Sequence, residues 1–305
     1  MRQPLLGRIV LVEVLVRYII STIVHIGGIG GRMMNLKEHI RQDIVDFVRD
    51  YGQEQGIVDV WRTPLVGFAD ARCDGIKRLK ELVSPEHVMP WEVLEDAAII
   101  IAYFVPFSKT LGETNACTGL ASPQWALAYE QTNAMFNALN DNLIHKLRLA
   151  GYHAAVSPEA TTFDRDKLIS HWSQRHIAYL AGLGSFGINN MLITKEGCCG
   201  RYSTIVTNLP VAADHPIKTD YCLYKKNGTC GVCTRHCSSG ALTCDGYDRK
   251  KCFAVLLKNA EVYTDFGSSY TNEDGTGSNS TGSEVCGKCV VHIPCATCAP
   301  GVKIR

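Results

Sequence analysis

Ten cysteines lie toward the C-terminal end of the chain, and their spacing constrains the fold more than any other feature. The run Cys230-x2-Cys233-x3-Cys237 has the tail spacing of the bacterial iron–sulfur run, in which three cysteines bind one cubane and the fourth binds its neighbour. Eight thiolates suffice for two 4Fe–4S clusters, so the pattern predicts a two-cluster module that carries electrons. The ten are Cys222, Cys230, Cys233, Cys237, Cys244, Cys252, Cys286, Cys289, Cys295 and Cys298.

Disulfides and structural zinc are the two alternatives for these thiols. A disulfide framework is disfavoured because the sequence shows no convincing secretory signal and the x2 spacings crowd the thiols closely. Paired Cys-x2-Cys steps also suit tetrahedral zinc. The x3 step to Cys237, followed by Ser238, Ser239 and Gly240, is less natural for a zinc knuckle. Iron–sulfur binding is therefore the favoured interpretation, with zinc second.

Length predicts one large and one small unit, and the density of cysteines favours the cytoplasm. The chain has 305 residues, 46% of them hydrophobic, which is enough to bury a full core. Its 31 basic and 30 acidic residues leave a net charge of +1, which gives no overall signature of tight nucleic-acid binding. Free thiols at this density are typical of a reducing compartment, so we expect a cytoplasmic location.

Residues 1–32 form an apolar-rich N-terminal segment. Glu13, Arg17 and His25 interrupt the stretch from Ile9 to Ile29, so it would make a poor membrane-spanning helix. The interpretation we favour is that residues 1–32 are a translated leader and that Met33 or Met34 is the real start. A membrane anchor and an ordinary first helix are the alternatives, and no membrane contact is expected.

Hydrophobic periodicity predicts alternating helices and buried strands from residue 33 to residue 215. An apolar stripe at helical spacing indicates amphipathic helices, and a run that is apolar on both faces indicates a sheet covered by helices. Together they favour a layered α/β or α+β core. The expected elements are helices at Leu36–Tyr51 and Ala126–Ala150, strands at Leu65–Ala69, Ala97–Val105 (ended by Pro106) and 152–156, and a hairpin-like pair of Leu192–Thr194 with Ser203–Thr207.

A glycine-rich segment follows a predicted helix near residue 180. Gly182, Gly184 and Gly187 would let the backbone approach a ligand closely and expose amides to its carbonyl or phosphate groups. A tight helix-to-strand turn explains the same spacing equally well. A dinucleotide fingerprint is excluded, because these glycines follow a helix rather than a strand.

These segments together resemble a known family. YLAGLGSFGINNMLIT, VGFADA, AAIIIAYFVPF and the cysteine array are similar to the epoxyqueuosine reductases and their relatives, the corrinoid iron–sulfur reductases that include reductive dehalogenases. The resemblance covers roughly Asn35 to Cys298. It implies a nitroreductase-like layered core at 33–215 that holds base-off cobalamin against a ferredoxin-like two-cluster module at 216–305. Electrons would pass through both clusters to the cobalt, which would drive a reductive step.

The resemblance also implies which thiols hold each cluster. The first set would be Cys222, Cys230, Cys233 and Cys295, and the second set would be Cys237, Cys252, Cys286 and Cys289. Cys244 and Cys298 are left over as free thiols. The chain departs from the family in a longer first spacing and in Ser238, where the family usually has proline.

The remaining site residues are expected around the glycine segment. The resemblance places Gly182, Gly184, Gly187, Asn189 and Asn190 beside the corrin, with Arg175 and His176 facing the cofactor or the substrate. The family's general acid lies in a short segment for which SPEATTFDRDKLISHW has no clean match. The catalytic candidates are Asp164, which is slightly preferred, Asp166 and Tyr179, and a solvated loop acid or a helix cap is the alternative role for either aspartate.

The expected partners are an external electron donor of the ferredoxin or flavodoxin type and a small-molecule or modified-nucleoside substrate. Family members often continue into a helical domain that helps to bind tRNA, whereas this sequence ends seven residues after Cys298, which weighs against a tRNA substrate. A second hypothesis is an electron carrier with two clusters and no corrinoid. Residues 265–284, rich in Gly, Ser, Thr and Asn, are expected to form a mobile loop.

Overall fold

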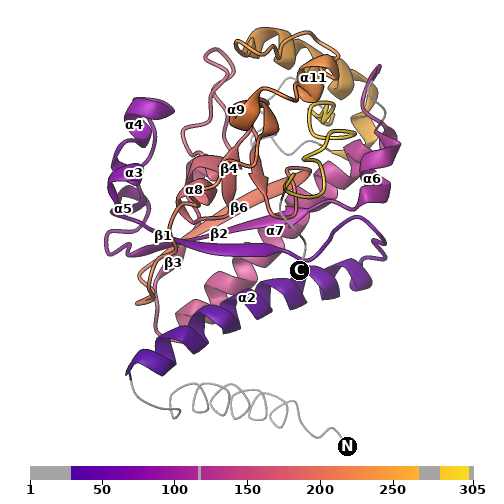
Figure 1. The fold of residues 1–305 in the computed structure, drawn as a ribbon. Helices are drawn as coiled ribbons and strands as arrows, with labels where there is room; N and C mark the ends of the chain where they lie inside the picture. Colours follow the sequence, from indigo (N-terminus) through magenta and orange to yellow (C-terminus); the bar gives the residue numbers. More distant parts are fainter. Residues whose placement is uncertain (1–28, 116–117, 268–281, 302–305) are drawn as a thin grey trace, which may run out of the picture.

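A four-stranded antiparallel sheet lies at the centre of the structure, with strand order β1-β2-β6-β3 (Figure 1).

The computed structural model describes residues 29–115, 118–267 and 282–301. Its strands are β1 (Leu65–Asp70), β2 (Ile99–Pro106), β3 (Ala154–Ala155), β4 (Gly184–Phe186), β5 (Leu192–Thr194) and β6 (Gly200–Thr207). Its helices are α2 (Ile29–Glu54), α3 (Asp74–Lys77), α4 (Leu79–Leu82), α5 (Pro90–Val93), α6 (Lys109–Thr114), α7 (Pro123–Leu149), α8 (Gln174–Leu180), α9 (Leu223–Asn227), α10 (Val232–Arg235) and α11 (Arg249–Val262), with short 3-10 turns η1 (Pro158–Ala160) and η2 (Thr264–Phe266).

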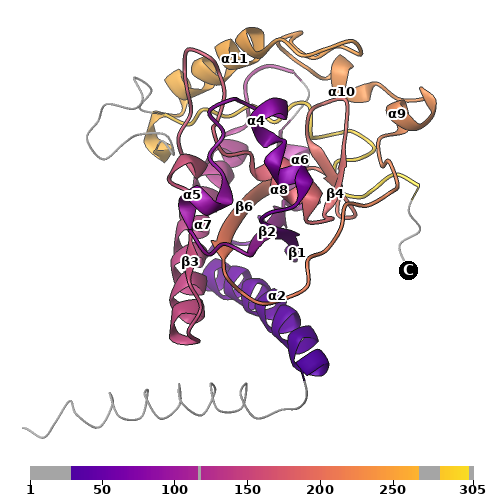
Figure 2. The ribbon, with the colours of Figure 1, turned by 90° about the vertical axis from the view of Figure 1, so that its left-hand side faces the viewer.

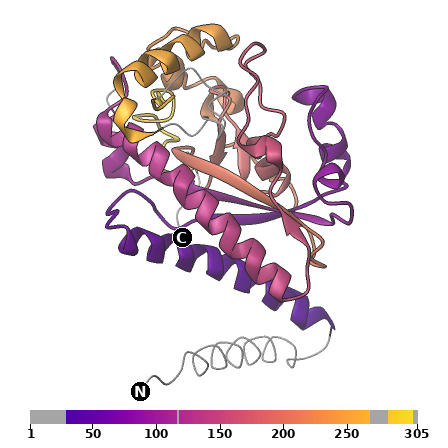
Figure 3. The same cartoon turned by 180° about the vertical axis from the view of Figure 1, so that it is seen from behind.

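Strand β2 is buried along its whole length because both faces of the sheet are covered. Alternate residues of a strand point to opposite faces. Ile101 and Tyr103 pack on one face against α2 and α7, while Ile100 and Phe104 pack on the other face in a core that includes Ile177 of α8. Figure 3 shows α7 and α2 crossing the same side of the sheet. The apolar run in the sequence is therefore explained by a sheet between two helical layers.

The long helix α7 begins where local chemistry favours a start. Ser122 accepts a hydrogen bond from the Trp125 amide at 3.1 Å, and Pro123 occupies the first turn, where its missing N–H costs nothing. The helix then carries its apolar stripe along the sheet, and the buried Asn140 side chain accepts a hydrogen bond from the Tyr103 hydroxyl at 2.6 Å. Capping and packing thus agree in placing α7 against β2.

The structure confirms most of the elements predicted for the core and corrects one pairing. The two long helices and the strands around residues 65, 100 and 154 are present. Leu192–Thr194 and Ser203–Thr207 are strands as expected, but they do not pair with each other. β5 pairs with β4 in a separate two-stranded sheet, and β6 lies between β2 and β3. The pairing prediction was wrong because β6 satisfies its backbone groups along β2. All pairings are antiparallel, so the mixed fold is α+β.

A third apolar core lies where the cysteine segment meets the sheet layer. Leu111 of α6 and Trp125 of α7 pack there with Cys222, Cys233 and Val291. Figures 1 and 2 show the described part of the 282–301 segment near α6, α9 and α10, with α11 along the outer side. The cysteine segment is thus packed against the core helices.

Two predicted segments lie partly outside the described residues. The expected leader is one of them, since the structure describes the chain from residue 29, where α2 begins. The expected mobile loop is the other: residues 268–281 lie outside the description, whereas Ser283 and Glu284 at its end are buried. No helix in the described part of the chain is both long and apolar enough to span a bilayer.

Replacing Gly184 with Ala should destabilise the fold by about 1–3 kcal/mol, because overpacking a tight backbone contact costs that much. A Cβ at this position would lie 2.1 Å from the Ile193 carbonyl oxygen in the paired strand β5. Gly246→Ala is the matched control, since a Cβ there meets nothing within 4 Å. Chemical unfolding of both variants measures the difference, and equal stabilities would contradict the assigned contact.

Candidate cluster and cofactor site

The four thiols of the first predicted set lie together. Cys233 interacts electrostatically with Cys295, Cys222 and Cys230, and burial followed by these three neighbours raises the pKa of the Cys233 thiol to about 12. All four line one small cavity, which Gly187 also reaches. Helices α9 and α10 position three of the thiols, and the turn after Ile293 positions the fourth.

The four thiols of the second predicted set form a neighbouring group. Burial, followed by Cys286, Cys252 and Cys237, raises the pKa of the Cys289 thiol. Cys252 lies in the first turn of α11, whose start is capped by Asp248 accepting from the Lys251 amide at 3.1 Å. The two sets are neighbours, because the charge on Cys233 of the first set also raises the pKa of Cys289 in the second set.

Backbone hydrogen bonds join the cysteine segment to the start of β6. The Cys198 amide donates to the Cys295 carbonyl at 2.9 Å, and the Cys199 amide donates to the Ala296 carbonyl at 2.9 Å. Gly197 makes this approach possible, since a Cβ there would lie 2.2 Å from the Ala296 oxygen and its φ is +87°. These contacts, called the backbone seam below, fix Cys295 relative to the sheet.

The donor chemistry fits two cubane clusters. Each set offers four thiols, which is the ligand number of a 4Fe–4S cluster. Burial and mutual repulsion disfavour several thiolates in one place, so a bound cationic centre is needed to hold them deprotonated. Every cysteine that the structure describes carries a free thiol. The ligand assignment stays a prediction, and the grouping of the eight thiols agrees with it.

A large cavity of about 950 Å³ opens beside the second set. Its size is at the upper end of the range of ligand sites in proteins. Cys252 lies in its wall, and Gly187 lines both this cavity and the small one at the first set. Neutral amides from α7, α8 and the glycine segment line it, namely Asn133, Asn137, Asn140, Gln174 and Asn190. A roomy, amide-lined and partly aromatic cavity fits a large ring that carries peripheral carboxamides, such as a corrin.

Arg175 and His176 line this cavity, and their expected role toward a cofactor or substrate stays a prediction. Arg175 donates from Nη1 to the Asn190 carbonyl at 2.5 Å, and burial lowers the pKa of its guanidinium. Burial, then Arg175 and His87, lowers the pKa of His176 to about 4, so its imidazole is neutral at pH 7. A neutral imidazole at this position can hydrogen-bond to a ligand but carries no charge toward it.

The glycine segment is a helix-to-strand turn packed against the chain itself. A Cβ at Gly182 would lie 2.4 Å from the His215 carbonyl oxygen, so the absence of a side chain serves an internal contact there. Asn189 is buried, and its side-chain amide donates to the Cys289 carbonyl at 3.0 Å. It also lines the small cavity at the first set. Gly187 and Asn190 line the large cavity. The structure thus favours the turn interpretation for Gly182 and Gly184 and leaves Gly187 and Asn190 facing the candidate cofactor site.

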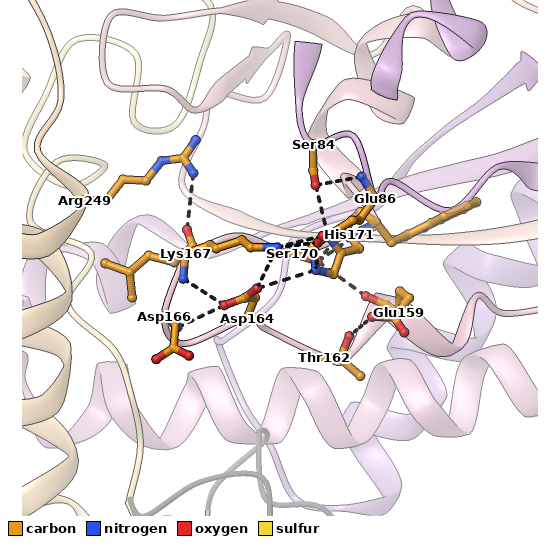
Figure 4. Close-up of polar contacts among 12 residues, drawn as sticks. Ser84, Glu86, Glu159, Thr162, Asp164, Asp166, Lys167, Ser170, His171 and Arg249 are labelled. Carbon is orange, nitrogen blue, oxygen red and sulfur yellow. Dashed lines mark hydrogen bonds and ion pairs between the residues drawn. The ribbon is translucent and has the colours of Figure 1, made fainter. Parts of the chain in front are cut away.

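The three catalytic candidates lie outside the described cavity lining. Asp164 accepts from the Lys167 and Asp166 amides at 2.8 and 3.0 Å, and these backbone donors, Lys167 first, lower the pKa of its carboxyl (Figure 4). Asp166 is exposed, and Tyr179 packs near Phe186. Phe163 and Leu168, which flank the Asp164 turn, do line the cavity. The acid role of Asp164 stays a prediction.

A network around Lys167 holds this turn to the α4–α5 connection (Figure 4). The Lys167 ammonium bonds both carboxylate oxygens of Glu86, at 2.7 and 2.8 Å, and lies 3.7 Å from Asp164. His171 lies 3.3 Å from Glu86 and 3.9 Å from Asp164. These contacts connect two loops that are far apart in the sequence.

His87 is a buried residue that the sequence analysis did not single out. Its Nδ1 lies 2.7 Å from the Val88 carbonyl and must donate to it, while Nε2 accepts from the Ser173 amide at 3.0 Å. The ring therefore has one fixed neutral tautomer and stacks on Trp172 at 5.7 Å. Ser173 precedes α8, so His87 positions the helix that brings Arg175 to the cavity. A single histidine without a partner motif gives no signal of this role in the sequence.

Comparisons with known proteins support the resemblance seen in the sequence. No family model matches the chain. A curated epoxyqueuosine reductase from Leadbetterella byssophila is 38% identical over 77 residues, which are 25% of this chain and 24% of that protein. The chain is thus similar to an epoxyqueuosine reductase, as the sequence predicts, over a stretch that spans about a quarter of the length of that relative.

Solved structures give weaker matches over a longer range. An epoxyqueuosine reductase crystallised with an epoxyqueuosine-modified tRNA-Tyr stem loop has a TM-score of 0.49 and 19% identity, covering 84% of this chain and 66% of that one. A reductive dehalogenase, described as bearing on B12-dependent dehalogenation, has a TM-score of 0.41 and 17% identity, covering 59% of this chain and 23% of that one. The chain spans less than two thirds of either structure.

The stability of the protein should fall as the pH drops from about 6.5 toward 4, partly through His87. Burial is the main cause that lowers the pKa of His87 to about 4, against an ordinary value of 6.5. In that window the unfolded imidazole binds a proton and the folded one does not, so acid favours unfolding. His87→Gln should flatten the dependence, because the variant lacks this proton-binding group. Urea unfolding at pH 5 and pH 7 gives the free energy of unfolding at each pH. The same change between the two pH values in His87→Gln and in the parent would contradict the prediction.

Proposed function

We propose that the chain is a reductase that resembles the epoxyqueuosine reductases, with two 4Fe–4S clusters and a cobalamin. The observation that carries this proposal is the position of Cys252, which belongs to the second cysteine set and also lies in the wall of the 950 Å³ cavity. An electron held at the second set would therefore be next to the cavity. The 38% identity to an epoxyqueuosine reductase favours the same reaction class.

The two cysteine sets are proposed to form an electron path. Clusters bound there would accept one electron at a time from an external ferredoxin or flavodoxin. The first set lies beside α9, where Lys225 and Lys226 are exposed. Exposed lysines suit an acidic donor, since complementary charge speeds encounter. Cys233 is near enough to Cys289 for their charges to interact, so electrons would pass from the first set to the second there.

The large cavity is proposed to hold the cobalamin and the reacting part of the substrate. When bound, the corrin would supply a low-potential metal centre for reductive removal of a group. The amide side chains of the cavity would bind the ring's carboxamides, and Arg175 would hold the Asn190 backbone in place. Asp164 is retained as the proposed proton donor, which would require its turn to release the carboxyl toward the cavity.

Charge in the cavity wall favours an anionic substrate. Four cationic side chains line it, against one acidic side chain, Glu130, among the described residues. A phosphate-bearing, modified nucleoside suits that balance better than a neutral small molecule, and tRNA should be assayed beside small substrates. The four cations are Arg175, Arg201, Lys225 and Arg249.

Anaerobically purified protein should contain about eight irons per chain, because each cubane takes four thiolates. Cys233→Ala should lose about half of the iron and destabilise the cysteine segment, since cluster binding contributes to folding. Cys244→Ala is the matched control, because this exposed thiol belongs to neither set. Iron analysis and visible spectra report the result. Unchanged iron in Cys233→Ala would overturn the ligand assignment, and zinc in place of iron would overturn the proposal.

Cluster-loaded protein should bind cob(II)alamin, and Asn137→Trp should weaken binding about tenfold or more, equivalent to about 1.4 kcal/mol, by filling the cavity. Asn137 is exposed on α7, so a larger side chain there should leave the core intact. Asn142→Trp is the matched control, an exposed position of the same helix away from the cavity. Anaerobic titration followed by absorbance measures both. Failure of the loaded parent to bind cob(II)alamin would favour the electron carrier without a corrinoid.

A further inference from the structure

Lys288 is a buried lysine between two cysteines of the second set. It follows Cys286-Gly287 and precedes Cys289, and its side chain is only 1% exposed. A buried ammonium is unfavourable unless hydrogen bonds and negative charge compensate for lost hydration. Lys288 therefore places a positive charge, shielded from water, beside two cysteines of the second set.

Asn115 holds the Lys288 ammonium and the cysteine backbone together. Its Oδ1 accepts from Lys288 Nζ at 2.8 Å, and its Nδ2 donates to the Cys286 carbonyl at 2.8 Å. Asn115 is fully buried at the end of α6, where its Oδ1 also accepts from the Ser122 amide at 3.1 Å. One side chain from the core thus fixes the ammonium relative to Cys286.

The turn between the two cysteines leaves little freedom for another arrangement. Gly287 has a φ of +76°, and a Cβ there would lie 2.3 Å from the Trp125 ring. The turn therefore packs directly against Trp125 of α7. The Lys288 charge acts on the Cys286 sulfur, so the ammonium and this cysteine are near neighbours.

We propose that Lys288 is a positioned counter-charge that raises the reduction potential of the cluster at the second set. This inference rests on the proposed function, because it requires a 4Fe–4S cluster on Cys237, Cys252, Cys286 and Cys289. Such a cluster gains one negative charge when the external donor gives it an electron. A fixed cation in a poorly solvated site stabilises the reduced form more than the oxidised form. Lys288 would thereby draw electrons from the first set toward the cavity.

Lys288→Met should lower the midpoint potential of one cluster and change the other less. The equilibrium constant for reduction should fall on the order of tenfold, which corresponds to 59 mV for a one-electron couple. A redox titration followed by electron paramagnetic resonance resolves the two clusters. Lys251→Met is the matched control, because Lys251 precedes ligand Cys252 but is 63% exposed, so water screens its charge.

Lys288→Arg keeps the charge and separates its effect from that of side-chain shape. If Lys288→Met loses the second cluster while Lys288→Arg keeps it, the counter-charge is required and the inference is supported. Unchanged potentials in a cluster-loaded Lys288→Met protein would overturn it, and so would loss of the cluster in both variants. A parent protein without clusters would overturn the proposed function as well, whereas the other two negative results concern Lys288 alone.

Discussion

The backbone seam between Cys198–Cys199 and Cys295–Ala296 is the contact on which the arrangement of the site depends. It joins the first residues before β6 to the segment that carries the last predicted ligand. Because β6 is held between β2 and β3, Cys295 is placed by the central sheet rather than by its own short loop. Cys198 adds a hydrogen bond between thiols, which lowers the pKa of Cys295 and raises its own. The position of the cysteine segment is therefore fixed by its hydrogen bonds to the residues that precede β6.

Sequence patterns predicted most of the helices and strands of the core, because hydrophobic periodicity depends on local spacing. The apolar run of β2 required two covered faces, and the structure supplies them. The division of eight cysteines into two sets came from the family resemblance, and the thiols gather in that way. Strand pairing was not predictable, because Leu192–Thr194 could satisfy its backbone groups with either neighbour, and only the tertiary fold chooses β4.

The residues that the sequence did not reveal act through contacts between distant segments. His87 and Ser173 are far apart along the chain, and so are Asn115 and Lys288. Neither pair forms a motif, and each residue type is common elsewhere in the chain. Asn189 shows the converse, since its place in the glycine segment suggested a cofactor contact while its amide binds the Cys289 backbone. Burial and partners decide such roles, and spacing does not encode them.

The same seam has a consequence for the order of folding. Contacts between residues far apart in sequence form slowly, because the chain loses conformational entropy before the contact can stabilise the fold. Cys222, Cys230 and Cys233 lie within one short stretch and can meet early. Cys295 is held by the seam, so we expect it to join them after the sheet has formed. If the first set binds a cluster as proposed, iron supplied to a nascent chain would meet three of its thiols before the fourth, and completion of that site would report that the core is folded.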